Sequence, residues 1–199
     1  MVELVEKKPE ELVQETYDKL KTAFMTHKTK AYKWRLDQLT GLLNGLKEFE
    51  KEVEEAMRID LGRDLFLSYV AEVSFMEAGI RHDARHLEGW MKDTREELEL
   101  LLAPGAMYTR YEPLGVVAVL GSWNAPFVTT VKPLIQAISA GNCAIVKPSE
   151  HSPACSAVIK KICDKWLDTE CITVIEGGVS EAVAINKLPV DLICFTGST

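Results

Sequence analysis

The second half of the chain alternates short continuous apolar runs with segments of helical periodicity. Four runs read as buried strands: Gly115–Leu120, Cys143–Val146, Ile172–Ile175 and Asp191–Phe195. The segments between them, 127–138, 153–166 and 180–187, carry apolar residues at helical spacing. Regular alternation of strand and helix requires parallel strands joined by right-handed crossovers. The sequence therefore predicts an α/β fold built on a parallel, Rossmann-like sheet.

The first half has a different pattern, because charged residues are concentrated there and the apolar residues recur every three or four positions. This spacing predicts three amphipathic helices, over residues 9–26, 30–57 and 66–92. Pro104-Gly105 marks a break after them. We therefore expect an N-terminal helical region over residues 1–104, and the first part of a dinucleotide-binding domain over residues 105–199.

Composition excludes several classes of protein. A net charge of −7 without a basic stripe makes nucleic acid an unsuitable partner. The charged N-terminus does not resemble a secretion signal, and no apolar run approaches the roughly 20 residues of a membrane helix. Five cysteines without a CxxC pair fit a reducing compartment better than a disulfide framework or a zinc site. We expect a cytoplasmic protein.

Ligands bind beyond the carboxyl ends of the strands in parallel sheets, and two of these ends carry suitable groups. Lys147-Pro148-Ser149-Glu150 follows the second strand, where Lys and Glu could bind ribose hydroxyls. A solvated loop with a capping Ser is the simpler interpretation of that tetrapeptide alone. Gly177-Gly178 follows the third strand and would let the backbone approach a flat ligand, although an ordinary turn is the better interpretation of the pair alone.

The other two strand ends are richer in small polar residues. Ser122-Trp123-Asn124-Ala125-Pro126 follows the first strand, and Pro126 suits the first turn of a helix. The Asn124 amide could donate to an oxyanion, or Asn124 could be the N-cap of that helix. Thr196-Gly197-Ser198-Thr199 follows the fourth strand and offers backbone N–H groups to a pyrophosphate. This turn is not the GxGxxG fingerprint and is a weak signal alone.

Two further groups do not support a site. His82 and His86 have the spacing of a metal pair, but no third ligand is evident, so we expect surface histidines. Cys143 and Cys194 lie in apolar strands and are expected to be inert buried thiols. The remaining three cysteines, Cys155, Cys163 and Cys171, are expected to be more exposed.

Taken together, EPLGVVAVLGSWNAPF, AISAGNCAIVKPSE, VIEGG and ICFTGST occur in an order that resembles the NAD(P)-dependent aldehyde dehydrogenases, most closely their class-three branch. The resemblance covers nearly the whole chain and is most specific over residues 112–150. It implies that Asn124 is the side-chain donor of the oxyanion hole. It also implies that the cofactor lies against Ser122, Trp123, Lys147, Glu150, Gly177, Gly178, Gly197 and Ser198.

The same resemblance implies a covalent mechanism. A cysteine thiolate attacks the aldehyde, hydride passes to the nicotinamide, and a glutamate-activated water releases the carboxylic acid. In the family, both that cysteine and the ELGG glutamate follow the glycine-rich turn at which this sequence stops. We therefore expect a truncated N-terminal portion that is inactive alone and whose complete protein is a homodimer. A binding or structural subunit without catalysis, and one half of a split enzyme, are the alternatives.

Glu150 should repel the 2′-phosphate of NADP, so NAD is the expected cofactor, with NADP as the alternative because Lys147 could compensate.

The last strand, 191–196, should expose an edge and an apolar face when the chain is alone, which favours aggregation or oligomerisation.

Overall fold

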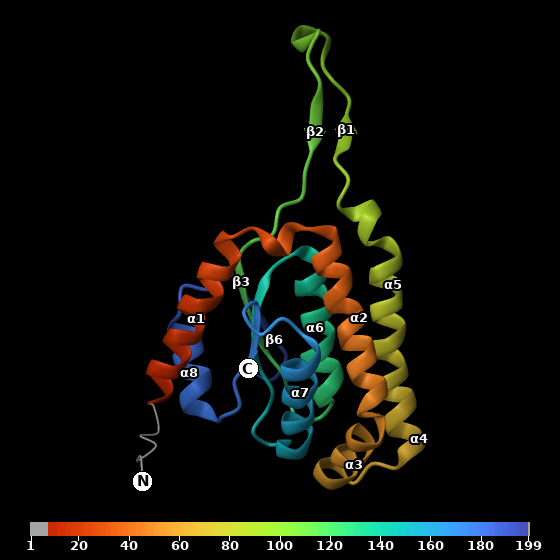
Figure 1. Ribbon diagram of the computed structural model, residues 1–199, viewed down its shortest axis with the longest axis vertical. Coiled ribbons are helices and arrows are strands. Elements are labelled where there is room, and N and C mark those ends of the chain that lie inside the picture. The colour runs from red at the N-terminus through yellow and green to blue at the C-terminus, as the bar shows by residue number, and fades with distance from the viewer. Residues whose placement is uncertain (1–7, 199) are drawn as a thin grey trace.

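The computed structural model describes residues 8–198, and helices dominate the first half (Figure 1). The predicted helix over residues 9–26 is confirmed as α1 (Pro9–Met25), which leads into a short 3₁₀ turn, η1 (Lys28–Lys30). The remaining helical elements of this half are α2 (Tyr32–Glu48), α3 (Glu50–Leu61), α4 (Leu65–Ser68), the π-helical segment η2 (Tyr69–Val73) and α5 (Ser74–Trp90). Elements α4, η2 and α5 follow one another without a gap and correspond to the predicted helix over residues 66–92.

The prediction of one continuous helix over residues 30–57 is wrong, because the chain changes direction at Phe49. This residue ends α2 and precedes α3 with φ −100° and ψ 17°, outside the α-helical region. Its side chain is buried, and the Lys161 ammonium lies 4.5 Å from the centre of its ring. Apolar residues keep their helical spacing across the break, since both helices bury a face, so the pattern does not reveal the turn.

The segment after α5 forms an antiparallel hairpin that the sequence pattern did not indicate. Strand β1 (Thr94–Glu96) pairs with β2 (Met107–Thr109), and the 3₁₀ turn η3 (Leu100–Leu102) lies at the tip. The hairpin extends well away from the body of the molecule (Figure 1). Pro104-Gly105 lies between the two strands. The division into regions 1–104 and 105–199 stays a prediction.

The parallel sheet is confirmed, with four strands in the order β5-β4-β3-β6. Each neighbouring pair is parallel, with Ala118 opposite both Ile145 and Ile193. The strands and their connecting helices are β3 (Val116–Leu120), α6 (Pro126–Ala140), β4 (Cys143–Lys147), α7 (Pro153–Trp166), β5 (Ile172–Val174), α8 (Val179–Lys187) and β6 (Leu192–Phe195). Gly62 and Gly141, both with a left-handed backbone conformation, end α3 and α6.

The elements form layers around this sheet. Helices α1 and α8 contact each other, and α1 lies against β3 and β4. Helices α6 and α7 also pack on the sheet and are covered by α2, α3 and α5 (Figure 1). Elements from both halves of the chain therefore share one hydrophobic core.

This layering corrects the prediction for three cysteines. Cys143 is buried as expected, and Cys194 is partly buried. The expectation that Cys155, Cys163 and Cys171 are more exposed is wrong, because all three are buried. The first two lie on α7, which has the sheet on one side and α2 and α3 on the other. A helix in a middle layer hides more of its surface than its amphipathic pattern suggests.

None of the described helices combines the length and hydrophobicity that a membrane-spanning segment needs. Within residues 8–198 no cluster of three His, Cys, Asp or Glu side chains has the arrangement of a metal site. His82 and His86 are exposed, as predicted, and their rings lie 4.3 Å apart on the surface of α5.

Candidate dinucleotide-binding site

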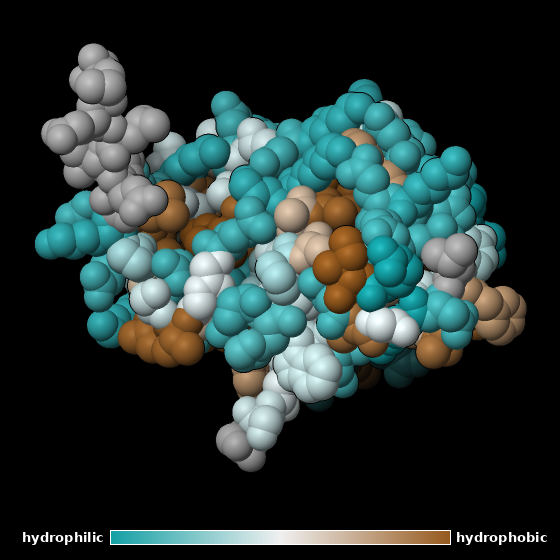
Figure 2. Space-filling model, turned by 90° about the horizontal axis from the view of Figure 1, so that it is seen from below, coloured by the Kyte–Doolittle hydropathy of each residue, from teal (hydrophilic) through white to brown (hydrophobic). Residues whose placement is uncertain are grey.

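The four predicted strand ends meet at one end of the molecule, opposite the hairpin. Strand β3 starts near the hairpin base and runs away from it, and its three parallel companions end at the same edge (Figure 1). Figure 2 views the molecule from this end and shows separate hydrophobic areas within a mainly hydrophilic face. The chain passes from β3 to β4 and β5 on one side and then places β6 on the other side of β3. Such a switch in strand order opens a crevice beside the ends of β3 and β6.

The end of β4 carries a linked pair of opposite charges. Lys147 is 5% exposed, and its ammonium lies 3.0 Å from the Glu150 carboxylate and 3.1 Å from the Pro148 carbonyl oxygen. A hydrogen bond from its own backbone N–H and the ion pair with Lys147 lower the pKa of Glu150. Glu150 itself is exposed. A buried ammonium therefore holds an ionised, solvent-facing carboxylate at this strand end, where it can accept hydrogen bonds.

The end of β5 depends on two glycines. Gly177 has a φ of 153°, and a Cβ there would lie 2.4 Å from the Glu181 side chain. The Glu181 carboxylate accepts a hydrogen bond of 2.7 Å from the Gly178 N–H. A Cβ on Gly178 would meet no atom within 4 Å, so the space beside this backbone is open.

The end of β3 holds Ser122, Trp123 and Asn124 in a loop before α6. The Ser122 hydroxyl donates to the Asn124 amide oxygen at 2.7 Å, and Trp123 is 54% exposed. Thr129 fixes the loop, since its hydroxyl accepts from the Ser122 N–H at 3.0 Å and donates to the Ala125 carbonyl at 2.9 Å. The N-cap of α6 is Ala125, so Asn124 is not the helix cap. Its amide oxygen is engaged, and its exposed NH₂ group has no acceptor among the described residues.

The end of β6 lies beside the end of β3. Phe195 is paired with Leu120, and the Thr196 N–H donates to the Leu120 carbonyl at 3.1 Å. Gly197 and Ser198, the two predicted cofactor residues here, are exposed. Thr199 lies outside the described residues. The structure thus brings the predicted residues of β3 and β6 to neighbouring positions, and those of β4 and β5 to the adjoining part of the same edge.

Sequence reasoning missed that acidic side chains from the first half of the chain occupy the N-termini of α6 and α7. Glu72, which is 1% exposed, accepts hydrogen bonds from the Phe127 N–H at 2.9 Å and the Val128 N–H at 3.3 Å. Arg63 pairs with Glu72 and also donates to the Asn124 carbonyl. Asp60 accepts from the Cys155 N–H at 2.8 Å. These carboxylates satisfy backbone donors that would otherwise attract an anion.

One of these residues had a signal in the sequence. Glu72 stands next to Val73 on the apolar side of its helix, in register with Tyr69 and Met76, where a carboxylate needs a partner when buried. Asp60 carries no comparable signal, because it lies at the end of a charged helix and before a glycine.

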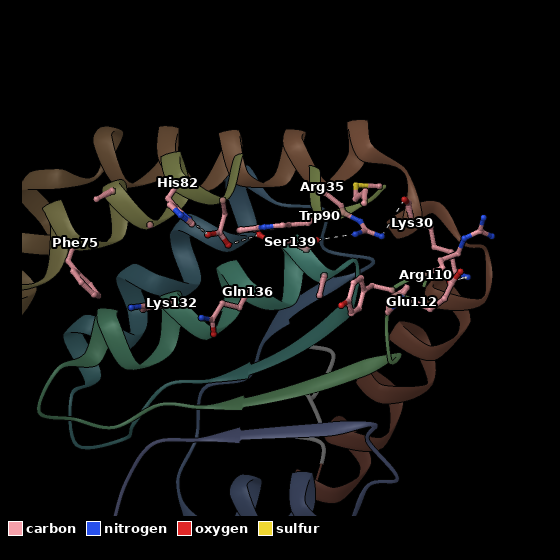
Figure 3. A pocket seen from close by; sticks show the side chains of 17 residues that line it. Lys30, Arg35, Phe75, His82, Trp90, Arg110, Glu112, Lys132, Gln136 and Ser139 are labelled. Atoms are coloured by element: carbon pink, nitrogen blue, oxygen red, sulfur yellow. Dashed lines mark hydrogen bonds and ion pairs between the residues drawn. The ribbon is translucent and has the colours of Figure 1, made fainter. Parts of the chain in front are cut away.

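A cavity of about 970 Å³ lies elsewhere, between α5 and α6 (Figure 3). None of the nine residues predicted for the oxyanion hole and the cofactor lines it. The strand-end residues are thus separate from this cavity.

Comparison with known proteins agrees with the motifs at these strand ends. The family model described as "Aldehyde dehydrogenase family" matches residues 2–199. The chain is 39% identical over 182 residues to an aldehyde dehydrogenase of Craterostigma plantagineum, covering 92% of this chain and 38% of the relative. It is 37% identical to aldehyde dehydrogenase family 3 member I1, chloroplastic, of Arabidopsis thaliana. That match covers 90% of this chain and 33% of the relative.

Solved structures share the fold. The substrate-bound state of AldH from Staphylococcus aureus superposes with a TM-score of 0.89 at 34% identity, covering 91% of this chain and 40% of that chain. The glyceraldehyde-3-phosphate dehydrogenase GapN of Methanocaldococcus jannaschii, complexed with NADP, superposes with a TM-score of 0.81 at 22% identity. The superposition covers 95% of this chain and 42% of that chain. The second similarity concerns the fold alone.

The chain spans only about a third to two fifths of the length of these relatives. Its match to the family model extends over nearly all its residues, and relatives named as family 3 members are 33–38% identical to it. The chain belongs to the aldehyde dehydrogenase family and is similar to its class-three members over their N-terminal portion.

Proposed function

We propose that this chain is the N-terminal part of an NAD(P)-dependent aldehyde dehydrogenase that oxidises an aldehyde to a carboxylic acid. The observation that carries the proposal is the distribution of carboxylates at the sheet edge. Glu72, Asp60 and Glu181 stand at the N-termini of α6, α7 and α8. A pyrophosphate is disfavoured there by like charge. By exclusion, the turn after β6, with Gly197 and Ser198, is where we place the pyrophosphate.

The remaining strand ends fit the other parts of a dinucleotide. Glu150 can accept hydrogen bonds from ribose hydroxyls, and Lys147 holds its carboxylate in place. The open space beside Gly178 suits a flat adenine ring, with Gly177 supplying the positive φ that shapes the turn. Ser122 and Trp123 would face the cofactor from the end of β3. The bound dinucleotide would supply the hydride acceptor of the oxidation.

Asn124 is proposed as the oxyanion donor. The Ser122 hydroxyl engages the Asn124 amide oxygen, which fixes which end of the amide is presented. The NH₂ group is thereby directed away from Ser122 and toward solvent at the sheet edge. A fixed amide donor can stabilise negative charge that develops on an aldehyde oxygen.

The chain's own cysteines are unsuited to be the nucleophile. Burial raises the pKa of Cys155, and it raises the pKa of Cys163 to about 12. Cys143 and Cys171 are buried side by side at the amino ends of β4 and β5, away from the proposed crevice. Cys194 lies within β6. A nucleophilic cysteine needs an accessible thiolate, so we propose that this chain alone does not turn over aldehydes.

NAD is the proposed cofactor, since Glu150 would repel a 2′-phosphate. NADP is the alternative, because the Lys147 ammonium lies beside Glu150.

The complete protein is proposed to be a homodimer. Residues 1–104 are proposed to be its helical region, and residues 105–199 the start of its cofactor domain. All five cysteines are unpaired, which fits the reducing cytoplasm as the proposed location.

Calorimetric titration of the purified chain with NADH tests the cofactor site. We expect saturable binding that weakens when Lys147→Met removes the support of Glu150. Lys165→Met is the matched control, because Lys165 pairs with Glu48 on α2, away from the sheet edge. A parallel assay with NAD and an aldehyde should show no NADH production. Absence of NADH binding would overturn the cofactor site, and turnover would overturn the proposed inactivity.

A further inference from the structure

Two of the five cysteines lie opposite each other on neighbouring strands, at the end of the sheet away from the candidate dinucleotide site. Cys143 is the first residue of β4, and Cys171 directly precedes β5. Ala144 is opposite Ile172, and the Ala144 N–H donates to the Cys171 carbonyl at 2.9 Å. The same register, continued by one residue, puts Cys143 opposite Cys171 and on the same face of the sheet.

This arrangement suits a disulfide. Neighbouring strands lie about 4.8 Å apart, and a disulfide joins Cα atoms that are about 4.4–6.8 Å apart. The two thiols are in hydrogen-bond contact, and both residues are 0% exposed. Cys155 and Cys163 differ from this pair, because they lie on the same helix about 12 Å apart along its axis, which is too far for a disulfide.

The surroundings make the two thiols of the pair unequal. The Cys143 thiol donates a hydrogen bond to the Cys171 sulfur and so lowers the pKa of Cys171, whereas burial and the Asp168 carboxylate raise it. The Lys28 ammonium, 2.9 Å from the Asp168 carboxylate, also contacts the Cys171 thiol and lowers its pKa further. The contact with Cys171 and burial raise the pKa of Cys143. Cys171 is therefore the sulfur that ionises, and Cys143 stays protonated beside it.

The Cys171 thiol lies only one side chain below the surface. Lys28 contacts this thiol, and the Lys28 side chain is itself 32% exposed. Thr169 and Glu170, the two residues before Cys171, are also exposed. Hydrogen peroxide is small enough to reach the sulfur when the Lys28 side chain moves aside. An aldehyde at the carboxyl edge of the sheet would lie at the opposite end of the strands.

We propose that Cys143 and Cys171 are a peroxide-sensitive thiol pair, which hydrogen peroxide oxidises reversibly to a disulfide that joins the amino ends of β4 and β5. This chemistry is independent of the cofactor edge and of aldehyde oxidation.

The oxidation takes place in two steps. The Cys171 thiolate attacks one oxygen of hydrogen peroxide, the O–O bond breaks, and the departing hydroxide takes up a proton to become water. The Cys143 sulfur then attacks the sulfenic sulfur of Cys171, the S–S bond forms, and the hydroxyl leaves with the Cys143 proton as a second water. The two cysteines lose two electrons, which peroxide gains. A thiol such as glutathione reduces the disulfide again by thiol–disulfide exchange.

Peroxide treatment of the purified full chain tests the proposal. The folded chain is exposed to equimolar hydrogen peroxide, unfolded, alkylated with iodoacetamide and examined by mass spectrometry. We expect a disulfide between Cys143 and Cys171 in the peptide map, and alkylation of both residues once dithiothreitol has been added. Alkylation of both residues after peroxide without dithiothreitol would overturn the proposal.

Alanine variants assign the roles of the two sulfurs. In Cys143→Ala the sulfenic acid of Cys171 has no thiol to attack it, so dimedone should label Cys171. In Cys171→Ala the remaining Cys143 thiol stays protonated, so dimedone should not label it. Cys163→Ala is the matched control, because it removes a buried cysteine of α7 and should form the same disulfide as the wild type. Label on Cys143 in Cys171→Ala, with none on Cys171 in Cys143→Ala, would overturn the proposed order of attack.

Circular dichroism of each variant checks that it is folded. If an alanine variant does not fold, the peptide map of the wild-type chain decides alone.

Discussion

The Glu72 carboxylate lies 2.9 Å from the backbone nitrogen of Phe127, so a side chain of the N-terminal region closes the start of the helix that follows β3. The same carboxylate pairs with Arg63, which also contacts the Asn124 carbonyl. Through these contacts, the loop that carries the proposed oxyanion donor is attached to two segments more than 50 residues earlier in the sequence.

Replacing Glu72 by Ala should lower the free energy of unfolding by about 3 kcal/mol. The change removes the acceptor of two backbone N–H groups and leaves Arg63 without its partner. Urea denaturation followed by circular dichroism measures the loss. Glu88→Ala is the control, because Glu88 is an exposed partner of Lys92 and its removal should change stability by less than about 0.5 kcal/mol. Equal effects of the two substitutions would contradict the capping role of Glu72.

Gly41→Ala should destabilise the protein by about 1–3 kcal/mol, although alanine is the better helix former. A Cβ at Gly41 would lie 2.4 Å from the backbone oxygen of Trp166 in α7, which cannot move aside cheaply. Gly79→Ala on α5 meets no atom within 4 Å and should stabilise the protein by roughly 0.5–1 kcal/mol. Thermal unfolding of both variants measures these opposite shifts. Stabilisation by Gly41→Ala would show that α2 and α7 are less closely packed than described.

Glu150→Gln should raise the affinity for NADPH relative to NADH by about tenfold at low salt, since it removes a negative charge beside Lys147. The change should diminish as ionic strength rises, because exposed charges are screened. Competition binding of the two cofactors measures the ratio. Glu170→Gln removes an exposed carboxylate in the loop between α7 and β5, where it pairs with Lys28, and should leave the ratio unaltered.

Asp168 should make the free energy of unfolding decrease at acidic pH. Partial burial alone would raise its pKa, but hydrogen bonds from Trp34 and Lys28 outweigh burial and lower the pKa. Because the unfolded chain then takes up the proton first, stability is complete above the unfolded aspartate pKa of about 3.9 and is lost as pH falls below it. Asp168→Asn should flatten the loss of stability below pH 4. Asp37→Asn, at an exposed i,i+4 pair with Lys33, should keep the wild-type profile. Parallel profiles for both variants would contradict this role.

The purified chain should self-associate through β6. Leu192, Ile193 and Phe195 are 43%, 41% and 61% exposed on this edge strand of the sheet. Exposed apolar edges favour pairing with another chain. Ile193→Lys should shift the protein toward monomer in light scattering coupled to size exclusion. Ile59→Lys, which changes an isoleucine that is 61% exposed on α3, is the control. A monodisperse wild-type monomer would contradict this expectation.

The fold of residues 115–195 follows closely from the sequence, because strand and helix periods are local. Predicted strand and helix bounds there differ from the structure by about two residues at most, which is the usual uncertainty of helix and strand ends. The break at Phe49 and the hairpin over 94–109 escaped prediction. The break at Phe49 does not interrupt the helical spacing of the apolar residues. The two strands of the hairpin are only three residues long, which is too short for a clear alternating pattern.

The sequence by itself determined the parallel sheet, the four strand ends and the family, since each rests on residues adjacent in the chain. Only the tertiary structure decided which side chains occupy the N-termini of α6 and α7, and why Cys155 and Cys163 are buried. Both depend on the packing of α3, η2 and α2 against helices at least 50 residues later. Contacts between such distant residues produce no periodic pattern in the sequence. They are determined by the path of the folded chain and not by the residues that are adjacent in the sequence.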